Sequence, residues 1–335
     1  MASKVLVMGG TGVMGAHLVP KLLKMGFVVD VVSLEDKISD NPKLRYFKGD
    51  IKERKFLEEL LKNDYNAIVD FMIYGTEEFS SKCSLFLSNT DQYFYLSSYR
   101  VYADSKTPLV ETSPRLLDVS DDKHYLASDD YSLHKARGED LLINSGKKNW
   151  TIVRPAITYS NQRIQLTCLE GNTVINRSRL GKPVIVPREA MTAQTTMTFG
   201  GDVAEMISRL VANKSALGEI YTTATAEHHS WETIAGYYKE LLGLRYIAVD
   251  TDEFLSVKSD EPYDNYRWKV IYDRVYDRII DNTKILNATG LNQSDLTPLF
   301  DGLKRELSSL PKDMVFGNLA YSGRMDEFLK KHNMI

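Results

Sequence analysis

Cysteine is scarce in this sequence, long apolar runs are missing, and neither sign of charge dominates. The two cysteines, Cys83 and Cys168, are too few for a disulfide framework or a four-cysteine zinc site, which fits a reducing compartment. No uninterrupted apolar stretch approaches the roughly 18 residues of a membrane span. The 42 basic residues nearly balance the 45 acidic ones, and the net charge of -3 argues against a general polyanion binder. We therefore expect a cytoplasmic protein that binds neither membranes nor nucleic acids.

The chain does contain enough apolar material for a proper core. Of its 335 residues, 43% are hydrophobic and 26% are charged, which suits one large domain or two modest ones. The six histidines show no spacing typical of a metal site, because the adjacent pair His228 and His229 points in different directions. We therefore expect no bound metal.

Short apolar segments alternate with helical patterns in the N-terminal half. Runs rich in β-branched and aromatic residues predict buried strands at 4–8, 27–33, 44–47, 67–72, 93–96 and 150–153. Helical spacing falls between several of these runs, at 13–24, 56–61 and 131–143. This alternation predicts right-handed βαβ units, and therefore the fold class α/β with a doubly wound parallel sheet of the Rossmann type.

The alternation weakens after Pro155. There we expect one more sheet strand at 220–222 and helices at 169–180, 202–211, 231–242 and 325–331. The region 250–282 is dense in Tyr, Asp and Arg and predicts no clear element.

A glycine-rich turn lies between the first strand and the first helix. Gly9, Gly12 and Gly15 have the spacing GxxGxxG. A pyrophosphate needs glycines there because the turn is tight, the backbone must approach the phosphates, and the helix must pack on the strand. The turn predicts a nicotinamide dinucleotide site, with contacts from Gly9, Thr11, Gly12, Val13, Met14 and Gly15.

The end of the second strand bears on the choice of cofactor. An acidic residue there would favour NAD by binding the adenosine ribose, but the position holds Ser33, with Glu35 shortly after it. No arginine or lysine adjoins Ser33 to bind an extra phosphate, although Lys37 is near. NAD is therefore favoured, and NADP is not excluded. Asp50, after the third strand, is predicted to cap the next helix or to contact the adenine.

These patterns divide the chain into three parts. Residues 1–160, completed by about 196–225, are expected to form a dinucleotide-binding Rossmann domain. The segments 161–195 and 226–310 are expected to form a smaller, mostly C-terminal substrate-binding region. Residues 311–335 are expected to be a C-terminal helical extension.

Three polar residues follow the fifth strand and open the next helix. Tyr131 and Lys135 are four residues apart and so project from one helix face, while Ser98 follows the strand. The lysine ammonium can lower the pKa of the phenol, and the serine hydroxyl can bind the reacting oxygen. The trio suits a proton transfer that is coupled to hydride exchange at a carbinol carbon.

With these motifs the sequence resembles the extended short-chain dehydrogenase/reductase family, in its nucleotide-sugar epimerase/dehydratase branch. The resemblance covers about residues 4–310 and rests on GGTGVMG at 9–15, Gly49-Asp50, SSYRVY at 97–102, Tyr131 with Lys135, and VRP at 153–155. It implies that Ser98 orients the substrate oxygen, Tyr131 is the acid/base, and Lys135 holds the nicotinamide ribose. It also implies cofactor contacts from Ile51, Phe71, Pro155 and Ile157.

Departures from the family pattern narrow the expected activity. Family dehydratases carry an acidic pair where this chain has Tyr99 and Arg100, so elimination of water is not expected. An arginine that family epimerases place ahead of the helix at Asp202 is also missing. The remaining candidates for substrate binding are Tyr74, Tyr99, Arg177, Arg274 and Arg278. An insertion is expected at 104–125, because Ser98 and Tyr131 are unusually far apart.

The resemblance implies an NAD(P)-dependent epimerase or ketoreductase that acts on a nucleotide-linked sugar. It also implies a homodimer that pairs through the helices near 76–89 and 129–146. Two alternatives remain open. One is an idle dinucleotide-sensing or RNA-binding relative, since 67–74 and 281–285 also resemble chloroplast stem-loop RNA-binding proteins. The other is a reductase of a small carbonyl compound.

Overall fold

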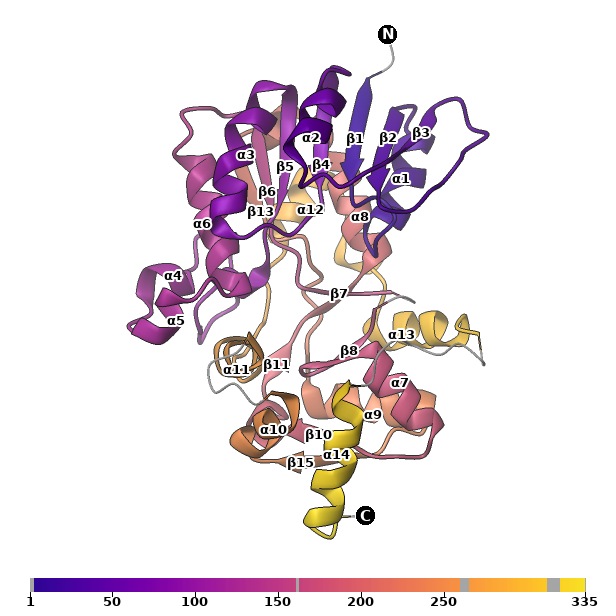
Figure 1. The fold of residues 1–335 in the computed structure, drawn as a ribbon, viewed down its shortest axis with the longest axis vertical. Helices are drawn as coiled ribbons and strands as arrows, with labels where there is room; N and C mark the ends of the chain where they lie inside the picture. The colour runs from indigo at the N-terminus through magenta and orange to yellow at the C-terminus, as the bar shows by residue number, and fades with distance from the viewer. Residues whose placement is uncertain (1–2, 161–162, 260–264, 312–319, 335) are drawn as a thin grey trace.

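The computed structural model describes residues 3–160, 163–259, 265–311 and 320–334. Its largest feature is a sheet of seven strands in the order β13-β6-β5-β4-β1-β2-β3, in which every pairing is parallel (Figure 1). The strands are β1 (Lys4–Met8), β2 (Val28–Ser33), β3 (Leu44–Lys48), β4 (Tyr65–Asp70), β5 (Thr90–Leu96), β6 (Trp150–Val153) and β13 (Glu219–Tyr221). This order reverses at β1, which confirms the predicted doubly wound Rossmann sheet.

Successive side chains of the central strand enter two different cores. Val5 and Val7 of β1 pack into one hydrophobic cluster, and Leu6 and Met8 pack into another. Both faces are therefore covered, as the uninterrupted apolar runs predict for a parallel sheet. One face carries α1 (Gly15–Lys24), α8 (Gly200–Leu210) and α12 (Thr283–Thr289), and the other carries α2 (Arg54–Leu61), α3 (Thr76–Ser88) and α6 (Tyr131–Ile143).

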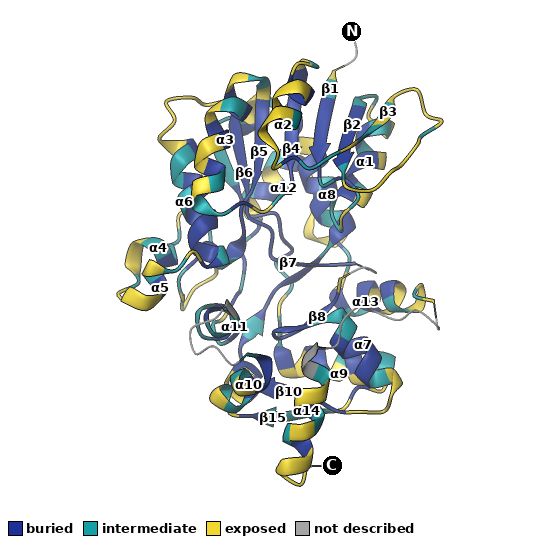
Figure 2. Ribbon diagram, in the orientation of Figure 1, coloured by how far each residue is buried: buried dark blue, intermediate teal, exposed yellow. Residues whose placement is uncertain are grey.

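The lower lobe is built from shorter elements around its own core (Figures 1 and 2). The parallel pair β10 (Val184–Pro187) and β15 (Tyr246–Val249) lies in it, as does the pair β8 (Gln165–Leu166) and β9 (Leu169–Glu170). Its helices are α7 (Gly171–Arg179), α9 (Trp231–Leu242), α10 (Thr251–Lys258), α13 (Leu299–Ser308) and α14 (Ala320–Lys331). The helix predicted at 169–180 begins only at Gly171, because Leu169 and Glu170 pair with β8.

The chain passes between the sheet and the lower lobe several times. The predicted strand at 220–222 is β13, which joins the sheet beside β6. Residues 283–296, predicted to belong to the substrate-binding region, return to the sheet, where Ile285, Leu291 and Leu296 pack in the cluster that includes α8. Residues 312–319, in the predicted C-terminal extension, lie outside the described residues. None of the described helices is long and apolar enough to cross a membrane.

The predicted insertion folds into two short helices. They are α4 (Leu116–Val119) and α5 (Lys123–Ala127), and they precede α6. Leu109, Leu116 and Tyr125 are buried there. Region 250–282, which predicted no clear element, holds α10, α11 (Asn265–Lys269) and the π-helical turn η4 (Val270–Arg274), and residues 260–264 lie outside the described part of the chain.

Candidate active site

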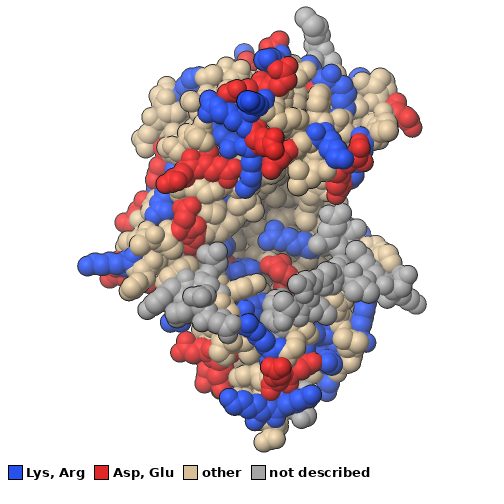
Figure 3. Space-filling view, viewed as in Figure 1, with Lys and Arg blue, Asp and Glu red and all other residues tan. Residues whose placement is uncertain are grey.

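Two connected cavities lie at the carboxyl ends of the central strands, where an open parallel sheet binds its ligands. One of them is ≈ 410 Å³ and the other ≈ 420 Å³, and both are lined by Gly9, Gly12 and Phe71. Figure 3 shows the molecule hollowed between the sheet and the lower lobe. We call the first the adenine-side cavity and the second the Tyr131 cavity, since each contains a predicted half of the site.

The glycine turn forms the floor that the two cavities share. Gly9 has a φ of 73°, which a residue with a side chain seldom adopts, and its N–H donates to Val32 O at 3.1 Å. A Cβ on Gly15 would overlap the backbone of Gly10, so close packing requires glycine there. A Cβ on Gly12 would meet only Gly9 O, at 3.3 Å, and would otherwise point into open space. This cradle fits a dinucleotide whose pyrophosphate lies over Gly12.

Predicted cofactor contacts fall on both sides of this turn. The adenine-side cavity is lined by Thr11, Ser33, Asp50 and Ile51, and the Tyr131 cavity by Val13, Met14, Gly15, Pro155 and Ile157. Asp50 does not cap α2, because its carboxylate accepts a hydrogen bond from Lys52 N at 2.9 Å. The structure therefore brings these nine predicted residues to one continuous cleft.

The adenine-side cavity has no cationic wall. None of the described residues that line it is Lys or Arg, whereas Glu35 does line it. Lys37 is bound to the Glu35 carboxylate at 2.7 Å. Ser33 and Glu35 are also linked, because Glu35 N donates to Ser33 Oγ at 2.9 Å. This wall suits a free ribose better than a phosphorylated one.

Ser98 and Tyr131 face the second cavity together. Tyr131 is the first residue of α6, whose N-terminus is capped by Asp130 through Ser132 N at 3.0 Å. Burial raises the pKa of the Tyr131 phenol, while the charges of Arg163 and Arg100 and a hydrogen bond with Ser98 act in the opposite direction. The surroundings of this phenol therefore include three groups that favour its anion.

Arg100 is the cation beside the phenol ring. Its guanidinium lies 5.4 Å from the centre of the Tyr131 ring and is almost closed to solvent, with 11% of the side chain exposed. It is paired with two carboxylates: its Nη2 donates to Asp130 at 3.4 Å, and its Nε lies 3.6 Å from Asp273. Arg100 was predicted only as a departure from the dehydratase pattern, although its place two residues after Ser98 is a signal for a role in the site.

Lys135 lies behind Tyr131 and does not line either cavity. Its side chain is buried, and its Nζ donates to Met72 O at 3.4 Å and lies 5.7 Å from the centre of the Tyr131 ring. Burial lowers the pKa of Lys135 to about 8, and the charges of Asp70 and Glu139 oppose that shift. Contact with the nicotinamide ribose therefore stays a prediction for this residue.

Two of the predicted substrate residues do line the Tyr131 cavity. These are Tyr99 and Arg274, and Arg274 Nη1 donates to the Tyr99 hydroxyl at 3.1 Å. Arg274 Nε also donates to Thr167 O at 2.8 Å, and its guanidinium is paired with Asp273. Of the described part of the chain, the four charged residues that line this cavity are all cationic: Arg100, Arg163, Lys269 and Arg274.

The other three predicted substrate residues lie away from the cleft. Tyr74 is buried against Phe79 on the far side of β4. Arg177 is wholly buried and binds Pro183 O, Ser322 and Asp326 in the lower lobe. Arg278 is buried between Asp273 and the carbonyls of Tyr102 and Ala103. These residues are held by structural partners and line neither of the two cavities, so their contact with substrate stays a prediction.

Among the described residues no group of three or more His, Cys, Asp or Glu side chains is arranged to hold a metal ion. The residues that sequence reasoning missed are Arg100, Thr158, Arg163, Gln165 and Lys269. Arg163 and Gln165 follow Pro155 closely, but Lys269 is far from the motifs in sequence and carries no local signal.

The sequence was compared with family models and with curated proteins. The family described as NAD(P)H-binding matches residues 9–182, which is 174 of the 335 residues. The chain is 39% identical over 61 residues to sterol-4-alpha-carboxylate 3-dehydrogenase, decarboxylating, of Homo sapiens, which covers 18% of this chain and 16% of the relative. It is 28% identical over 94 residues to UDP-glucose 4-epimerase of Streptococcus mutans, a match that covers 26% of this chain and 28% of the relative. The matched segments thus span less than a third of either relative.

Solved structures match over nearly the whole chain at low identity. MoeE5 in complex with UDP-glucuronic acid and NAD has a TM-score of 0.69 at 18% identity, covering 91% of this chain and 98% of that one. The Thermus thermophilus UDP-glucose 4-epimerase complex with NAD has a TM-score of 0.67 at 16% identity, covering 93% of this chain and 100% of that one. WbmH of Bordetella bronchiseptica with NAD+ has a TM-score of 0.68 at 17% identity, covering 94% of this chain and 100% of that one.

The family match covers the glycine turn, and the structural matches include the sheet and the lower lobe. The chain therefore belongs to the NAD(P)H-binding family and has the fold of the extended short-chain dehydrogenases/reductases, as the resemblance predicted.

Proposed function

We propose that this protein is an NAD-dependent enzyme that performs transient or net hydride transfer at a ring carbinol of a nucleotide-linked sugar, as an epimerase or as a ketoreductase. One observation carries the proposal: Ser98 and Tyr131 line the same cavity as the glycine turn. A dinucleotide over Gly12 would therefore have its reactive end beside a hydroxyl donor and an ionisable phenol.

The residues of the chain would divide the proton chemistry as follows. Tyr131, as the phenolate, accepts the hydroxyl proton of the substrate, while Ser98 donates a hydrogen bond to the same oxygen. Bound NAD would supply the acceptor for the hydride that leaves the carbinol carbon. Arg100 and Arg163 favour the phenolate by charge. Return of the hydride to the other face of the carbonyl carbon would give an epimerase. Release of the reduced cofactor would give a dehydrogenase, and the reverse of that reaction is the one a ketoreductase performs.

The cationic wall supports an anionic substrate. Among the described residues that line the Tyr131 cavity, the four charged ones are all Arg or Lys, and a nucleotide diphosphate carries the complementary charge. The similar structures agree with this class, since MoeE5 was solved with UDP-glucuronic acid and NAD. Three of these cations already pair with carboxylates: Arg100 with Asp130, Lys269 with Glu170, and Arg274 with Asp273. The preference for a nucleotide-linked substrate over a small uncharged carbonyl compound therefore rests mainly on the similar structures.

Mass spectrometry of ligands released from the denatured protein, followed by turnover assays on a panel of nucleotide sugars, tests the proposal. We expect NAD in the released fraction or in a binding titration, and conversion of at least one nucleotide sugar that is lost in Tyr131→Phe. Binding of structured RNA in a filter assay, with no NAD bound and no turnover, would instead support the RNA-binding alternative.

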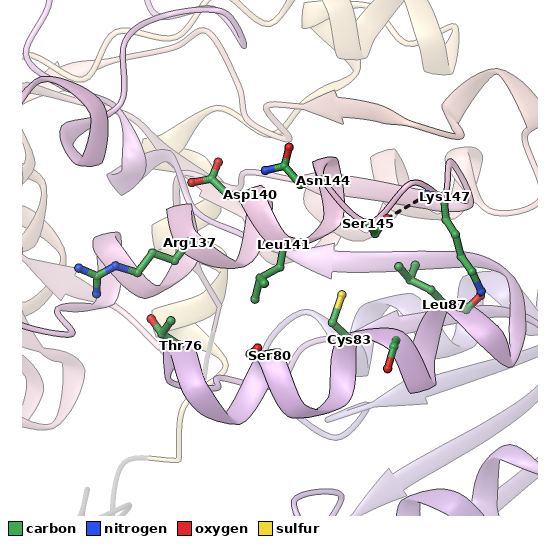
Figure 4. Close-up of a pocket in the computed structure, with 11 residues that line it drawn as sticks. Thr76, Ser80, Cys83, Leu87, Arg137, Asp140, Leu141, Asn144, Ser145 and Lys147 are labelled. Atoms are coloured by element: carbon green, nitrogen blue, oxygen red, sulfur yellow. Dashed lines mark hydrogen bonds between the residues drawn. The ribbon is translucent and has the colours of Figure 1, made fainter.

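We propose that the assembly is a homodimer in which α3 and α6 of two copies meet. The groove between these helices is ≈ 590 Å³ (Figure 4). Small side chains such as Ser80 and Ser84 line it together with the longer Arg137, Asp140 and Lys147. Small residues let the helices of a second copy approach closely. Light scattering should give twice the 38.1 kDa mass of one chain, and Ser84→Arg should give the single mass. A parent protein at the single mass contradicts the dimer.

We propose the cytoplasm as the compartment. Both cysteines are buried free thiols, and burial raises the pKa of Cys83 to about 11, so neither is poised for oxidation. Fractionation of cells that produce the protein, with a cytoplasmic and a secreted marker, tests this location.

A further inference from the structure

One arginine on the wall of the Tyr131 cavity uses few of its hydrogen-bond donors. A guanidinium has five N–H donors, but Arg100 forms one side-chain hydrogen bond with the described residues, from Nη2 to Asp130 at 3.4 Å. Its Nε is buried and has no hydrogen-bond partner in the described part of the chain. Only 11% of the side chain is exposed, so solvent supplies few acceptors. Arg100 is therefore a nearly enclosed cation with unused donors.

The fully buried arginines of the described chain behave differently. Each of them donates hydrogen bonds from all three guanidinium nitrogens: Arg154, Arg177, Arg274 and Arg278. A buried donor without an acceptor costs free energy, which is why such complete pairing is the rule. Arg100 departs from this rule, and it does so at the wall of a cavity that a ligand can enter.

The charge around Arg100 is also not fully compensated. Asp130 pairs with Arg100, and its carboxylate is also occupied by the backbone at the start of α6. Asp273 is shared by three arginines: Arg100, Arg274 and Arg278. Three arginines thus share two carboxylates, which leaves one positive charge in excess. An acceptor with a single negative charge would complete the group.

Arg100 lies beside the residues that would hold the reacting oxygen. Its backbone N–H donates to Ser98 Oγ at 3.2 Å, and its guanidinium lies 5.4 Å from the centre of the Tyr131 ring. A group bound by Arg100 would therefore lie next to the reacting carbinol, on the sugar ring itself. The diphosphate has another cation in the same cavity, since Arg163 lines it and has no carboxylate partner among the described residues.

We infer that the sugar of the substrate is a uronate, in which the exocyclic carbon is a carboxylate, and that Arg100 binds this carboxylate. The inference rests on the proposed function and narrows the substrate class of the same site. A carboxylate presents two coplanar oxygens that match the N–H groups of a guanidinium, whereas the CH2OH group of a neutral hexose presents one uncharged oxygen. Arg100 is then a specificity-determining residue that selects the sugar and does not carry the reacting proton.

Matched pairs of nucleotide sugars test this inference, because the two members of a pair differ only at the exocyclic carbon. The pairs are UDP-glucuronate with UDP-glucose, UDP-galacturonate with UDP-galactose, and GDP-mannuronate with GDP-mannose. Calorimetric titration of the full-length protein loaded with NAD should give a dissociation constant lower by about tenfold or more for the uronate, in the pair that binds best. Equal affinity within every pair overturns the inference, and this comparison needs no variant.

Arg100→Met removes the cation and keeps a side chain of similar reach. It should bring the two dissociation constants of that pair to within about threefold of each other. Asp273 keeps two arginines and Asp130 keeps the α6 backbone, so both carboxylates retain partners in this variant. A preference that survives in folded Arg100→Met overturns the inference. Equal weakening of both members overturns it as well, because Arg100 would then bind the diphosphate that the members share.

Arg188→Met is the control for the loss of one positive charge. The Arg188 side chain is 64% exposed, lies 3.8 Å from the Asp250 carboxylate and lines neither cavity. This variant should keep the parent ratio within each pair, and loss of the preference here would also overturn the inference. Arg100→Lys keeps the charge without the planar guanidinium and should keep part of the preference.

The two proposals can fail separately. A parent protein that converts neutral nucleotide sugars and binds uronates no more tightly refutes the role of Arg100 and leaves the proposed function in place. A parent protein that prefers uronates through Arg100, but converts none of them, refutes the proposed reaction and leaves the specificity in place. Binding of no nucleotide sugar refutes both.

Discussion

Arg154 binds the carboxylate of Glu139 through two parallel hydrogen bonds, from Nε at 2.8 Å and from Nη2 at 2.7 Å, where neither side chain reaches solvent. Arg154 directly follows β6, and Glu139 lies one helical turn beyond Lys135 on α6. The pair therefore fixes the helix that carries Tyr131 to the edge of the sheet from which Pro155 enters the cleft.

Glu139→Gln tests how much this attachment contributes. It leaves the buried Arg154 guanidinium without its carboxylate, which costs about 3–5 kcal/mol for a broken buried pair. Denaturant titration should show this loss in the free energy of unfolding. Glu59→Gln is the control, because Glu59 pairs with Lys62 on the exposed side of α2 and its loss should have no measurable effect. Equal effects of the two substitutions would contradict the role of the buried pair.

Arg100→Gln should shift the pH dependence of the reaction. The Arg100 charge lowers the pKa of Tyr131, so its removal raises that pKa and reduces the phenolate at a given pH. Since the phenolate is the active form, the acid side of the kcat profile should move to higher pH. Arg100→Lys keeps a positive charge and should move the profile less. An unmoved profile in Arg100→Gln would show that this cation does not act on Tyr131.

Tyr131→Phe keeps the aromatic ring and removes only the ionisable oxygen. We expect kcat to fall by roughly 10²–10⁴-fold, the scale of a lost general acid/base, with NAD affinity and thermal unfolding near those of the parent. Steady-state kinetics on the substrate found in the panel, together with calorimetry, measure both. Activity within a few-fold of the parent would rule out Tyr131 as the acid/base.

Substitutions at two glycines of the turn should have different effects, one on NAD binding and one on stability. Gly12→Val should fold, because its side chain meets only Gly9 O and open space, and should abolish NAD binding by filling the cradle. Gly15→Ala should lower the unfolding temperature, because its Cβ overlaps the Gly10 backbone. Calorimetric titration and thermal unfolding separate the two effects. A folded Gly12→Val protein with unchanged NAD affinity would show that the dinucleotide does not bind at this turn.

NAD should bind at least tenfold more tightly than NADP, which corresponds to about 1.4 kcal/mol. The physical reason is that the adenine-side cavity presents Glu35 and no cation among its described lining residues. Calorimetry with both cofactors measures the ratio, and Glu35→Gln should narrow it by removing a charge that repels the extra phosphate. Tighter binding of NADP to the parent would reverse the assignment.

The sheet could be predicted from the sequence because its signals are local. Val5 to Met8 form an unbroken apolar run, and the glycine turn follows at once, so strand, turn and helix are all read within about twenty residues. The helix at Tyr131–Ile143 was predicted with the observed bounds for the same reason. The helix at 169–180 was shortened by a strand pair, which depends on a contact rather than on spacing.

The substrate end was harder because the fate of an arginine depends on distant partners. No local sequence signal distinguishes Arg177 from Arg274. Arg177 pairs with Asp326 inside the lower lobe, whereas Arg274 pairs with Asp273 and also lines the Tyr131 cavity. Lys269 is also placed there by tertiary structure alone. Periodicity reports which face of an element is apolar, but it does not report which carboxylate a buried cation will meet.

The bond between Arg177 and Asp326 has a consequence for the order in which the two halves mature during synthesis. α7 leaves the ribosome well before α14, and until α14 follows, Arg177 lacks this carboxylate and the lower core lacks Met325 and Leu329. The first six strands of the sheet, by contrast, are all made by residue 153. However, α8 and α12, which cover one face of that sheet, are made only by Thr289. A nascent chain should therefore acquire a protease-resistant nucleotide half once α12 is made, while the other half stays open to cleavage until translation of α14 is complete.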